Sequence, residues 1–358
     1  MSDEYMATAK IVKVDPAFPR EELLMQAAHV LASGGLVIIP TETVYGIAAD
    51  SSNQKTVERL YAIKQRPKDK PFSLHIDEKE KIELFAKDIP VAAYKLIEKF
   101  WPGPLTLILK SINTGTIGIR LPDNNVARAV ISLSKVNVVC PSANISGKPA
   151  PVNFQEAIRD LKELVDFAID TGETAKGVES TIVDATLSPL CVVREGAIKA
   201  AEIEAVIKRK FVLFVCTGNS CRSVMAEALL KDALHKHNRR DVDVASAGVM
   251  MMAGSGASEQ TREVLAQEGM DVSTHRSQRV SRDLLNKADL ILVMERMHET
   301  RLLELDPLVK NRLFLLREFA KVRDNHLDIP DPIGSSMEFY RETYAAIKES
   351  IEKVCSII

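Results

Sequence analysis

Residues 211–223 (FVLFVCTGNSCRS) place two cysteines around a short polar loop, with an arginine directly after them. The apolar run before the loop predicts a buried strand that ends at Cys216, and a helix is expected to begin close to Ser223. A loop that joins a strand to a helix N-terminus presents backbone N–H groups to a hollow that favours anions. Arg222 adds a fork of donors that matches phosphate oxygens. A thiol in this positive field becomes a ready nucleophile, and Ser223 could hydrogen-bond the thiolate.

The other residues of the loop fit the same interpretation. Gly218 lets the chain turn tightly, and Asn219 can bond local backbone and hold unusual dihedral angles. A zinc site would need further cysteine or histidine at ligand spacing, and the sequence has no C-x2-C or H-x3-5-H pattern. Two cysteines that merely pack in a tight turn are the alternative, but packing does not explain Arg222. We therefore favour a loop that binds an anion.

Length and composition indicate the number of domains and the expected compartment of the protein. The chain has 358 residues, which is long for one compact domain and suits two. Its formal net charge of -2 argues against wholesale electrostatic binding to nucleic acid. The polar start MSDEYMATAK fits no signal or transit peptide, and no apolar run approaches the roughly 18 residues of a membrane span. Five scattered cysteines are typical of a reducing compartment, so we expect a cytoplasmic protein without membrane association.

The order of apolar and amphipathic stretches indicates an α/β protein of two domains. The expected strands of the first half include residues 34–40, 114–122 and 136–144, with helices at 56–66 and, closing the domain, 200–210. The second half is expected to have strands at 211–216, 242–248, 288–294 and 312–319, with helices at 224–237 and 337–354. This alternation predicts a parallel sheet with helices on both faces. We place the domains at residues 1–208 and 209–358.

The second half resembles the low-molecular-weight protein phosphatase family. The resemblance is carried by VCTGNSCRSVMAEALL (215–230), SAGV (246–249) and DIPDPIG (328–334), and it extends from residue 211 to the C-terminus. It implies that Cys216 is a nucleophile that forms a phosphocysteine and that Asp331 is first a general acid and then a general base. It also implies that Arg222 and the phosphate loop hold the phosphate without a cofactor; this loop comprises Thr217, Gly218, Asn219, Ser220, Cys221 and Ser223.

Two positions bear on the substrate of such a phosphatase. Tyrosine-specific relatives tend to have a bulky aliphatic residue at the position of Ser220 and aromatic residues where Ile333 and Gly334 follow Asp331-Pro332. Protein-arginine phosphatases carry a small hydroxyl residue at the Ser220 position, so the resemblance slightly favours phosphoarginine over phosphotyrosine.

Thioredoxin-coupled arsenate reductases also contain CTGNSCRS and are a less favoured alternative. Their disulfide relay needs two further cysteines, whereas only Cys355 follows Cys221 in this sequence. Cys221 could instead form a reversible protective disulfide with Cys216, or it could be a packing residue.

The first half has clusters of Ser, Thr, Asn, Lys and Arg where its expected strands end. Strand ends commonly build a ligand cleft, and several separate cations suit a triphosphate. Neither a Walker motif nor a G-x-G-x-x-G fingerprint is present. Each cluster alone could be a turn or a solvated face, but together they favour a shared cleft. The clusters are residues 40–46, 64–75, 118–122, 140–147, 177–184 and 192–196.

In order along the chain, PTETVYG, KQRP…KP, WPGPLTLIL, IRLPD, PSANISGKP and STIVD…VVREG resemble the YrdC-like threonylcarbamoyl-AMP synthases over about residues 10–208. The resemblance implies a twisted open α/β sheet with a concave, positively charged cavity. It implies synthesis of threonylcarbamoyl-AMP and pyrophosphate from L-threonine, bicarbonate and ATP, with Mg²⁺ bridging the phosphates. The product would pass to the tRNA-modification machinery that makes threonylcarbamoyladenosine.

The same resemblance assigns residues to two ligands. Thr43, His75 and Arg120 are expected to contact threonine. Lys70 stands where some relatives have asparagine, and a longer cation there could still serve a phosphate. The residues expected at ATP are Lys64, Arg66, Lys70, Thr116, Ser142, Asn144, Ser180 and Arg194.

We therefore expect a bifunctional enzyme that combines a nucleotidyltransferase with a cysteine-dependent phosphatase of a phosphorylated protein. The rival hypothesis for the first half is a non-catalytic RNA-binding module whose basic cleft grips backbone phosphates. The rival for the second half is a binder of phosphorylated residues, which would need neither Cys216 nor Asp331.

Overall fold

The computed structural model describes residues 8–250, 254–322 and 326–358. The chain divides into two compact units, Met1–Val206 and Ile207–Ile358. The division falls inside helix α6 (Ala200–Lys208), the segment that the sequence predicted as a closing helix. Within the described residues, no helix is long and apolar enough to cross a bilayer.

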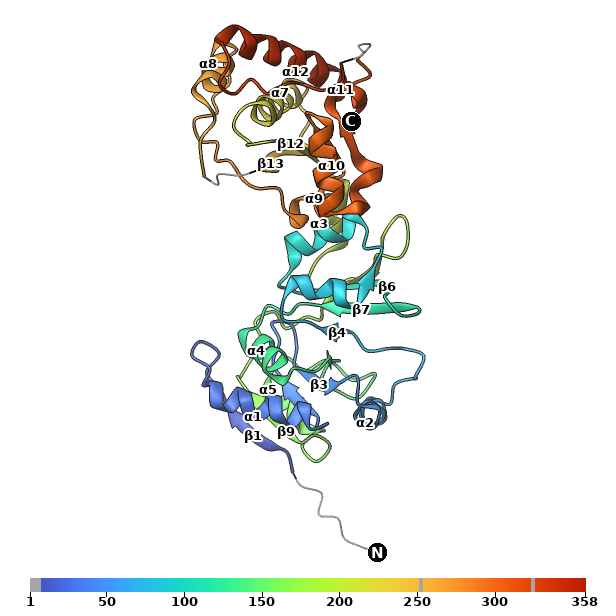
Figure 1. The fold of residues 1–358 in the computed structure, drawn as a ribbon. Coiled ribbons are helices and arrows are strands. Elements are labelled where there is room, and N and C mark those ends of the chain that lie inside the picture. The colour runs from blue at the N-terminus through green and yellow to red at the C-terminus, as the bar shows by residue number, and fades with distance from the viewer. Residues whose placement is uncertain (1–7, 251–253, 323–325) are drawn as a thin grey trace, which may run out of the picture. The chain divides into compact units, whose positions relative to one another are not determined.

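The N-terminal unit is built on a mixed sheet, which has eleven strands among the described residues. Its strands are short, and β2 (Val37–Ile39) and β3 (Gly46–Asp50) are buried at every residue, so their side chains are mostly apolar rather than alternating apolar and polar. Figure 1 shows the strands crossing the unit between helices. The strand order is β1 (Lys10–Lys13), β9 (Phe167–Asp170), β2 (Val37–Ile39), β3 (Gly46–Asp50), β8 (Val138–Val139), β4 (Leu74–His75), β7 (Thr116–Arg120), β6 (Leu105–Ser111), β10 (Thr181–Asp184) and β11 (Cys191–Arg194), with β5 (Ala86–Lys87) on β6.

Helices cover both faces of this sheet because successive residues of a strand point to opposite faces. Ile38 of β2 packs with α2 (Gln54–Lys64) and α5 (Phe154–Arg159), whereas its neighbours Val37 and Ile39 pack with α1 (Glu21–Ala32) and α4 (Asn125–Ser134). The remaining helices of the unit are η1 (Lys79–Leu84) and α3 (Val91–Phe100).

Strand pairing also brings distant candidate residues together. Strand β4 is parallel to β7, and in that register His75 lies beside Arg120. Strand β10 is parallel to β6 and antiparallel to β11, which brings the chain around Ser180 close to Arg194. The functional candidates therefore gather at one region of the sheet although they are far apart in the sequence.

The C-terminal unit has a four-stranded sheet in the part of the chain that the structure describes, and all its strands are parallel. This confirms the predicted fold class. The order is β13 (Val242–Gly248), β12 (Lys210–Cys216), β14 (Leu290–Val293) and β15 (Leu313–Leu315). The helices are α7 (Arg222–Lys236), α8 (Glu259–Gln267), α9 (Arg282–Lys287), α10 (Arg296–Leu305), η2 (Pro307–Arg312), α11 (Leu316–Phe319) and α12 (Met337–Ile357).

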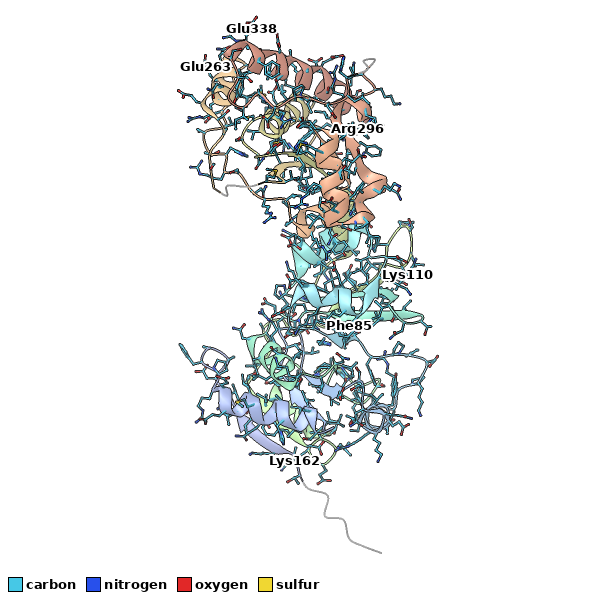
Figure 2. The ribbon with its side chains drawn as sticks, in the orientation of Figure 1. Phe85, Lys110, Lys162, Glu263, Arg296 and Glu338 are labelled. Carbon is cyan, nitrogen blue, oxygen red and sulfur yellow. The ribbon has the colours of Figure 1, made fainter. Side chains whose placement is uncertain are left out.

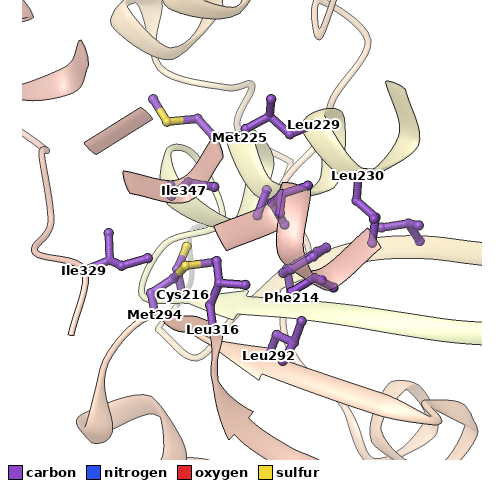
Figure 3. Packing of buried hydrophobic residues seen from close by; sticks show 14 of the residues in the cluster. Phe214, Cys216, Met225, Leu229, Leu230, Leu292, Met294, Leu316, Ile329 and Ile347 are labelled. Atoms are coloured by element: carbon purple, nitrogen blue, oxygen red, sulfur yellow. The ribbon is translucent and has the colours of Figure 1, made fainter. Parts of the chain in front are cut away.

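Helices again cover both faces, as the sequence predicted. Phe214 and Cys216 of β12 pack with residues of α7 and α12 on one face (Figure 3), whereas Leu213 and Val215 pack with residues of α9 and α10 on the other. Glu263 of α8 and Glu338 of α12, two charged residues on the helices of the unit, point outward (Figure 2). Cys216 therefore sits at the buried end of the first strand of the unit.

One predicted strand is wrong in part. Residues 312–319 (RLFLLREF) were expected to be one strand, but the strand stops at Leu315, and Leu316 begins the short helix α11. Leu316 and Ala320 pack into the core together with β12, so a helical turn buries this apolar run as well as a longer strand would.

Candidate active sites

Most carbonyl groups of the loop from Cys216 to Arg222 accept hydrogen bonds from neighbouring segments, whereas several of its amides are open. The carbonyls of Cys216, Thr217 and Ser220 accept hydrogen bonds from the amides of Val249, Met250 and Ser258. No described residue accepts a hydrogen bond from the amides between Gly218 and Cys221. These open N–H groups precede the N-terminus of α7, where the helix dipole adds a partial positive charge. The loop therefore has the geometry of an anion site.

Asn219 holds the loop in this conformation. Its φ is 54°, a left-handed conformation that asparagine tolerates better than most residues. The buried amide side chain donates to Ser223 Oγ at 3.0 Å and to Ser246 Oγ at 2.8 Å, and it accepts from the backbone amide of Gln278 at 2.9 Å. The carbonyl of Asn219 lies 2.8 Å from His275 Nε2.

The Arg222 guanidinium is 1% exposed and is held from two sides. Nη1 donates to Glu295 Oε2 at 2.5 Å and to the carbonyl of Ile329 at 2.8 Å. Nη2 donates to Thr217 Oγ1 at 3.0 Å and to Asp331 Oδ2 at 2.5 Å. Nε is buried and has no hydrogen-bond partner among the residues that the structure describes. A buried unpartnered donor beside open amides is what a bound oxyanion would satisfy.

Arg222 contacts Asp331 at the end of the loop that begins with Cys216, and the catalytic roles expected of these three residues remain predictions. Cys216 Sγ lies 3.0 Å from Ser223 Oγ, so the hydroxyl can donate to an ionised sulfur. Asp331 contacts Arg222 directly, and its other oxygen accepts from the amide of Ile333 at 3.2 Å.

Cys221 has its own surroundings. Its sulfur lies 3.3 Å from Ser258 Oγ and 3.6 Å from the hydroxyl of Tyr340, and no cysteine in the structure forms a disulfide. Burial and the neighbouring Cys221 raise the pKa of Tyr340 to about 12. Ser220 lies on the other side of the sulfur, with its Oγ 3.6 Å away.

His298 is a further member of this site. The ring is fully buried on the first turn of α10, and its Nε2 lies 3.0 Å from Thr217 Oγ1. Burial and the nearby Arg222 charge lower the pKa of His298 to about 4, so the imidazole is neutral near pH 7.

The N-terminal unit has a hollow that is open to solvent and lined mainly by polar side chains. Its lining combines hydroxyl groups, cations and a histidine. Among the predicted residues, those that line the hollow are Arg66, His75, Arg120, Ser142, Ser180 and Arg194.

A buried ion pair fixes the position of Arg120 in the lining of the hollow. Its Nη2 donates to Glu42 Oε1 at 2.7 Å and to Thr43 Oγ1 at 2.8 Å, and Nε donates to the carbonyl of Gly103 at 3.3 Å. Thr43 therefore lies next to Arg120, although it does not line the hollow, and the expected contact of both residues with threonine remains a prediction. The other oxygen of Glu42, Oε2, is buried, and no residue in the described part of the chain donates a hydrogen bond to it.

His75 presents an acceptor. Its Nδ1 lies 3.2 Å from the carbonyl of Ser73, and a carbonyl only accepts, so Nδ1 carries the hydrogen and Nε2 carries the lone pair. Burial and the charge of Arg120 lower the pKa of His75 to about 3, which keeps the ring neutral.

Lys64 holds a loop rather than facing the hollow. Its ammonium donates to the carbonyl and Oγ of Ser142 at 2.7 and 3.3 Å and to the carbonyl and Oδ1 of Asn144 at 2.6 and 2.7 Å. Burial and the charge of Arg66 lower the pKa of Lys64 to about 8. The three predicted residues are thus one connected group, of which Ser142 reaches the lining.

The other cations of the lining also have protein partners. Arg194 donates to Glu179 Oε1 at 2.8 Å and to the carbonyl of Ser180 at 2.8 Å. Arg66 donates to the carbonyls of Lys70 and Pro71 at 2.8 and 3.1 Å.

Lys70 and Thr116 do not line the hollow. The side chain of Lys70 is exposed, and Thr116 stands exposed at the start of β7, about 13 Å along the strand from Arg120 at about 3.3 Å per residue. Their expected contacts with ATP remain predictions.

Several residues at these sites were not singled out from the sequence. Glu42 stands inside the PTETVYG motif, where a charge between apolar strands was a usable signal. Glu295, His298 and His275 lie outside every motif, and their spacing carries no signal. Among the described residues, no cluster of three or more His, Cys, Asp or Glu could hold a metal ion.

The parallel sheet, the open loop and the buried Arg222 define the C-terminal unit as a cysteine-phosphatase fold, and the N-terminal unit is an open mixed sheet with a cation-lined hollow. The profile of the Sua5/YciO/YrdC family, described as telomere recombination, matches residues 29–196. The profile of low molecular weight phosphotyrosine protein phosphatases matches residues 211–358.

Relatives extend these matches. A putative threonylcarbamoyl-AMP synthase of Methanocaldococcus jannaschii is 37% identical over 186 residues, which cover 50% of this chain and 88% of the relative. EpsP of Ralstonia solanacearum, a probable low molecular weight protein-tyrosine-phosphatase, is 37% identical over 143 residues, which cover 40% of this chain and 92% of the relative. The chain belongs to both families, to the first through its N-terminal unit and to the second through its C-terminal unit.

The solved structure of Sua5 from Pyrococcus abyssi in complex with L-threonine matches with a TM-score of 0.53 at 26% identity, over 85% of this chain and 99% of that chain. The threonylcarbamoyl-AMP synthases of P. abyssi and Bacillus subtilis are 42% and 38% identical where they align, and this chain spans 56% of the length of each.

Proposed function

We propose that the N-terminal unit joins L-threonine, bicarbonate and ATP into threonylcarbamoyl-AMP and pyrophosphate. The guanidinium of Arg120 carries the proposal. The protein holds its Nε and Nη2, which leaves Nη1 for the carboxylate of threonine. His75 supports it because a neutral ring with its hydrogen on Nδ1 can accept from the threonine hydroxyl at Nε2. The threonine complex of P. abyssi Sua5 supports the choice of amino acid.

In the proposed reaction, the amino group of threonine adds to bicarbonate with loss of water and gives a carbamate. A carbamate oxygen then attacks the α-phosphorus of ATP, and the bond to pyrophosphate breaks. The chemistry needs no covalent intermediate on the protein, so charge neutralisation and positioning supply the rate. Arg66, Arg194 and Ser180 would face the phosphates, and Lys64 would act through the loop that contains Ser142 and Asn144.

Magnesium, when bound with ATP, neutralises charge on the phosphates. The carboxylate in the lining, Glu179, is paired with Arg194, so the residues fit an ion held by phosphate oxygens and water rather than by a protein cage. The adenylate product would pass to the machinery that modifies tRNA.

Release of pyrophosphate that depends on threonine and bicarbonate tests this function. We expect Arg120→Ala to abolish it and Arg59→Ala, which removes a half-exposed ion pair with Asp166, to leave it unchanged. An RNA-binding module would show no threonine-dependent release in the wild-type protein and would bind RNA through Arg66 and Arg194.

We also propose that the C-terminal unit is a cysteine-dependent protein phosphatase. The open amides of the loop, together with the unpartnered Nε of Arg222, carry this proposal. The thiolate of Cys216 would attack phosphorus, and the bond to the leaving group would break as Asp331 protonates it. Asp331 would then take a proton from the water that cleaves the phosphocysteine, which releases inorganic phosphate and restores the thiolate. Ser223 would donate to the sulfur as it leaves.

For this phosphatase we propose phosphoarginine as the preferred substrate. Ile333 is 64% exposed and is followed by Gly334, so no aromatic ring follows Asp331-Pro332 to stack on a phenol. Ser220 places a small hydroxyl group in the loop, next to the amides that would hold the phosphate. EpsP, at 37% identity, is named a probable tyrosine phosphatase, and this makes phosphotyrosine the competing substrate.

Two measurements test the phosphatase proposal. We expect Cys216→Ser to abolish hydrolysis of an aryl phosphate; activity retained by this variant would exclude Cys216 as the nucleophile. We expect a higher kcat/KM on phosphoarginine peptides than on matched phosphotyrosine peptides, and an equal or reversed ratio would contradict the preference. That both activities work in one chain is part of the proposal, and assaying the full-length protein for both tests it.

A further inference from the structure

His298 is connected to the anion loop through a chain of hydrogen bonds whose directions are fixed. The backbone amide of Glu295 donates to Nδ1 of His298 at 3.1 Å. A nitrogen that accepts carries no hydrogen, so the neutral ring carries its hydrogen on Nε2. Nε2 lies 3.0 Å from Thr217 Oγ1 and therefore donates to it.

Thr217 links His298 to Arg222 because its hydroxyl oxygen is hydrogen-bonded to both side chains. Its Oγ1 also accepts from Arg222 Nη2 at 3.0 Å, so both acceptor sites of the hydroxyl are filled, one by His298 and one by the guanidinium. Because two donors hold the hydroxyl oxygen of Thr217, its side chain is restrained in this rotamer. Nη2 of Arg222, which also donates to Asp331, therefore has an uncharged acceptor in a fixed position.

This contact matters most when Asp331 is engaged elsewhere. In the ground state Nη2 is held by Asp331 and by Thr217, whereas Nη1 is held by Glu295 and Ile329. When Asp331 protonates the leaving group, its hold on Nη2 weakens, and Thr217 is the remaining protein contact of that nitrogen. A weakened contact there would disturb the transition state more than the binding of the substrate.

We propose that His298 is a positioning residue of the phosphatase, which orients the Arg222 guanidinium through the hydroxyl of Thr217 while Asp331 transfers its proton. The proposal rests on the phosphatase function proposed above. The buried histidine would then serve the reaction and not merely pack within α10. Neutrality suits this role, since a protonated ring would set a hydrogen on Nδ1 against the amide of Glu295.

The chain offers matched variants for a test. His298→Asn keeps an acceptor near the amide of Glu295 but is too short to donate to Thr217, whereas His298→Gln can extend a donor toward Thr217. Thr217→Val removes the hydroxyl and keeps the shape. His237→Asn changes an exposed histidine at the end of α7 and serves as the control.

With phenyl phosphate as the probe, whose leaving group needs the proton from Asp331, we expect His298→Asn and Thr217→Val each to lower kcat about 10-fold with KM changed less than 2-fold, an effect of about 1.4 kcal/mol on the barrier. The double variant should be no slower than the slower single variant, because both break the same chain. His298→Gln should recover part of kcat, and His237→Asn should match the wild type.

Losses that multiply in the double variant, or a loss confined to KM or to thermal stability, would overturn the proposal. If the wild-type protein hydrolyses no aryl phosphate, the phosphatase function itself has failed. Binding of inorganic phosphate to the same variants then decides the remaining question: non-additive weakening would support the restraint on Arg222, and unchanged binding would refute it.

Discussion

The carboxylate of Asp331 lies 2.5 Å from Nη2 of Arg222, although the two residues are 109 positions apart in the sequence. The ion pair places a carboxylate beside the anion loop, and Nε of Arg222 has no hydrogen-bond partner among the described residues. A phosphate that enters the loop would compete with Asp331 for Nη2 and would turn the carboxyl group toward the leaving group. In the proposed reaction, this competition would couple phosphate binding to placement of the proton donor.

Removal of that acid should matter in proportion to the need of the leaving group for a proton. We expect Asp331→Asn to lower kcat on phenyl phosphate about 100-fold or more. The loss on p-nitrophenyl phosphate should be much smaller, because nitrophenolate leaves without protonation. Steady-state kinetics with the two esters check this, and equal losses on both would argue that Asp331 acts only on Arg222.

Gly248 borders the anion loop closely. A Cβ at this position would lie 2.8 Å from the carbonyl oxygen of Thr217 and 3.0 Å from the amide nitrogen of Asn219, both backbone atoms that cannot rotate away. We expect Gly248→Ala to weaken competitive inhibition by inorganic phosphate at least about 10-fold, the effect of a distortion costing about 1.4 kcal/mol. Gly256→Ala is the control because a Cβ there meets open space; similar constants for both variants would contradict the prediction.

Stability of the N-terminal unit should fall as the pH is lowered from about 6.5. The folded-state pKa of His75 is lowered to about 3, so the unfolded chain takes up a proton that the folded chain refuses. The contribution is therefore present above the unfolded pKa and is lost progressively below it, by up to about 1.4 kcal/mol per pH unit. Trp101, the one tryptophan of the chain, is buried in this unit and reports its unfolding by urea.

The His75→Phe variant should show a flatter dependence between pH 6.5 and 4.5, a range in which most carboxylates are still ionised. His29→Gln, an exposed change on α1, should retain the wild-type slope. Parallel curves for the wild type and His75→Phe would mean that His75 titrates normally.

Replacing only one residue of the buried ion pair between Glu42 and Arg120 should strongly lower the free energy of unfolding. Both side chains are about 5% exposed, so Glu42→Leu leaves an uncompensated guanidinium in the interior, and we expect a loss of about 3–5 kcal/mol of unfolding free energy. Adding Arg120→Met should restore much of it. Asp88→Asn, at the exposed pair with Lys110, should cost less than about 1 kcal/mol. A double variant less stable than Glu42→Leu would contradict this account.

Sequence pattern predicted most elements of the C-terminal unit well, because β14 and the part of β12 from Phe211 onward are continuous apolar runs. Residues 242–248 form β13 as expected, and the chain after the anion loop forms α7. The partial failure at residues 312–319 has a physical cause: Leu315 and Leu316 are both buried, a pattern that fits a short strand followed by a helical turn as well as one longer strand.

The candidate sites were predictable where a motif concentrates them and not where only tertiary packing does. Arg222 and Asp331 lie in contact although they are far apart in the sequence, and the motifs around them had singled out both residues. The partners of Lys64 depend on how the loop around Asn144 folds back, and the sequence has no periodic signal for that. His298 contacts Thr217 from helix α10, which lies far from the anion loop in the sequence, and a single sequence gives no signal for such a contact.

The central claim is that the sulfur of Cys216 takes the phosphoryl group inside the anion loop. Rapid acid quenching during turnover of p-nitrophenyl phosphate, followed by mass spectrometry of the peptides, tests it most directly. The account predicts a phosphoryl group on the peptide at Cys216 in the wild-type protein and none in Cys216→Ser. Turnover with the label on another residue, or with no label on Cys216 while hydrolysis proceeds, would contradict it.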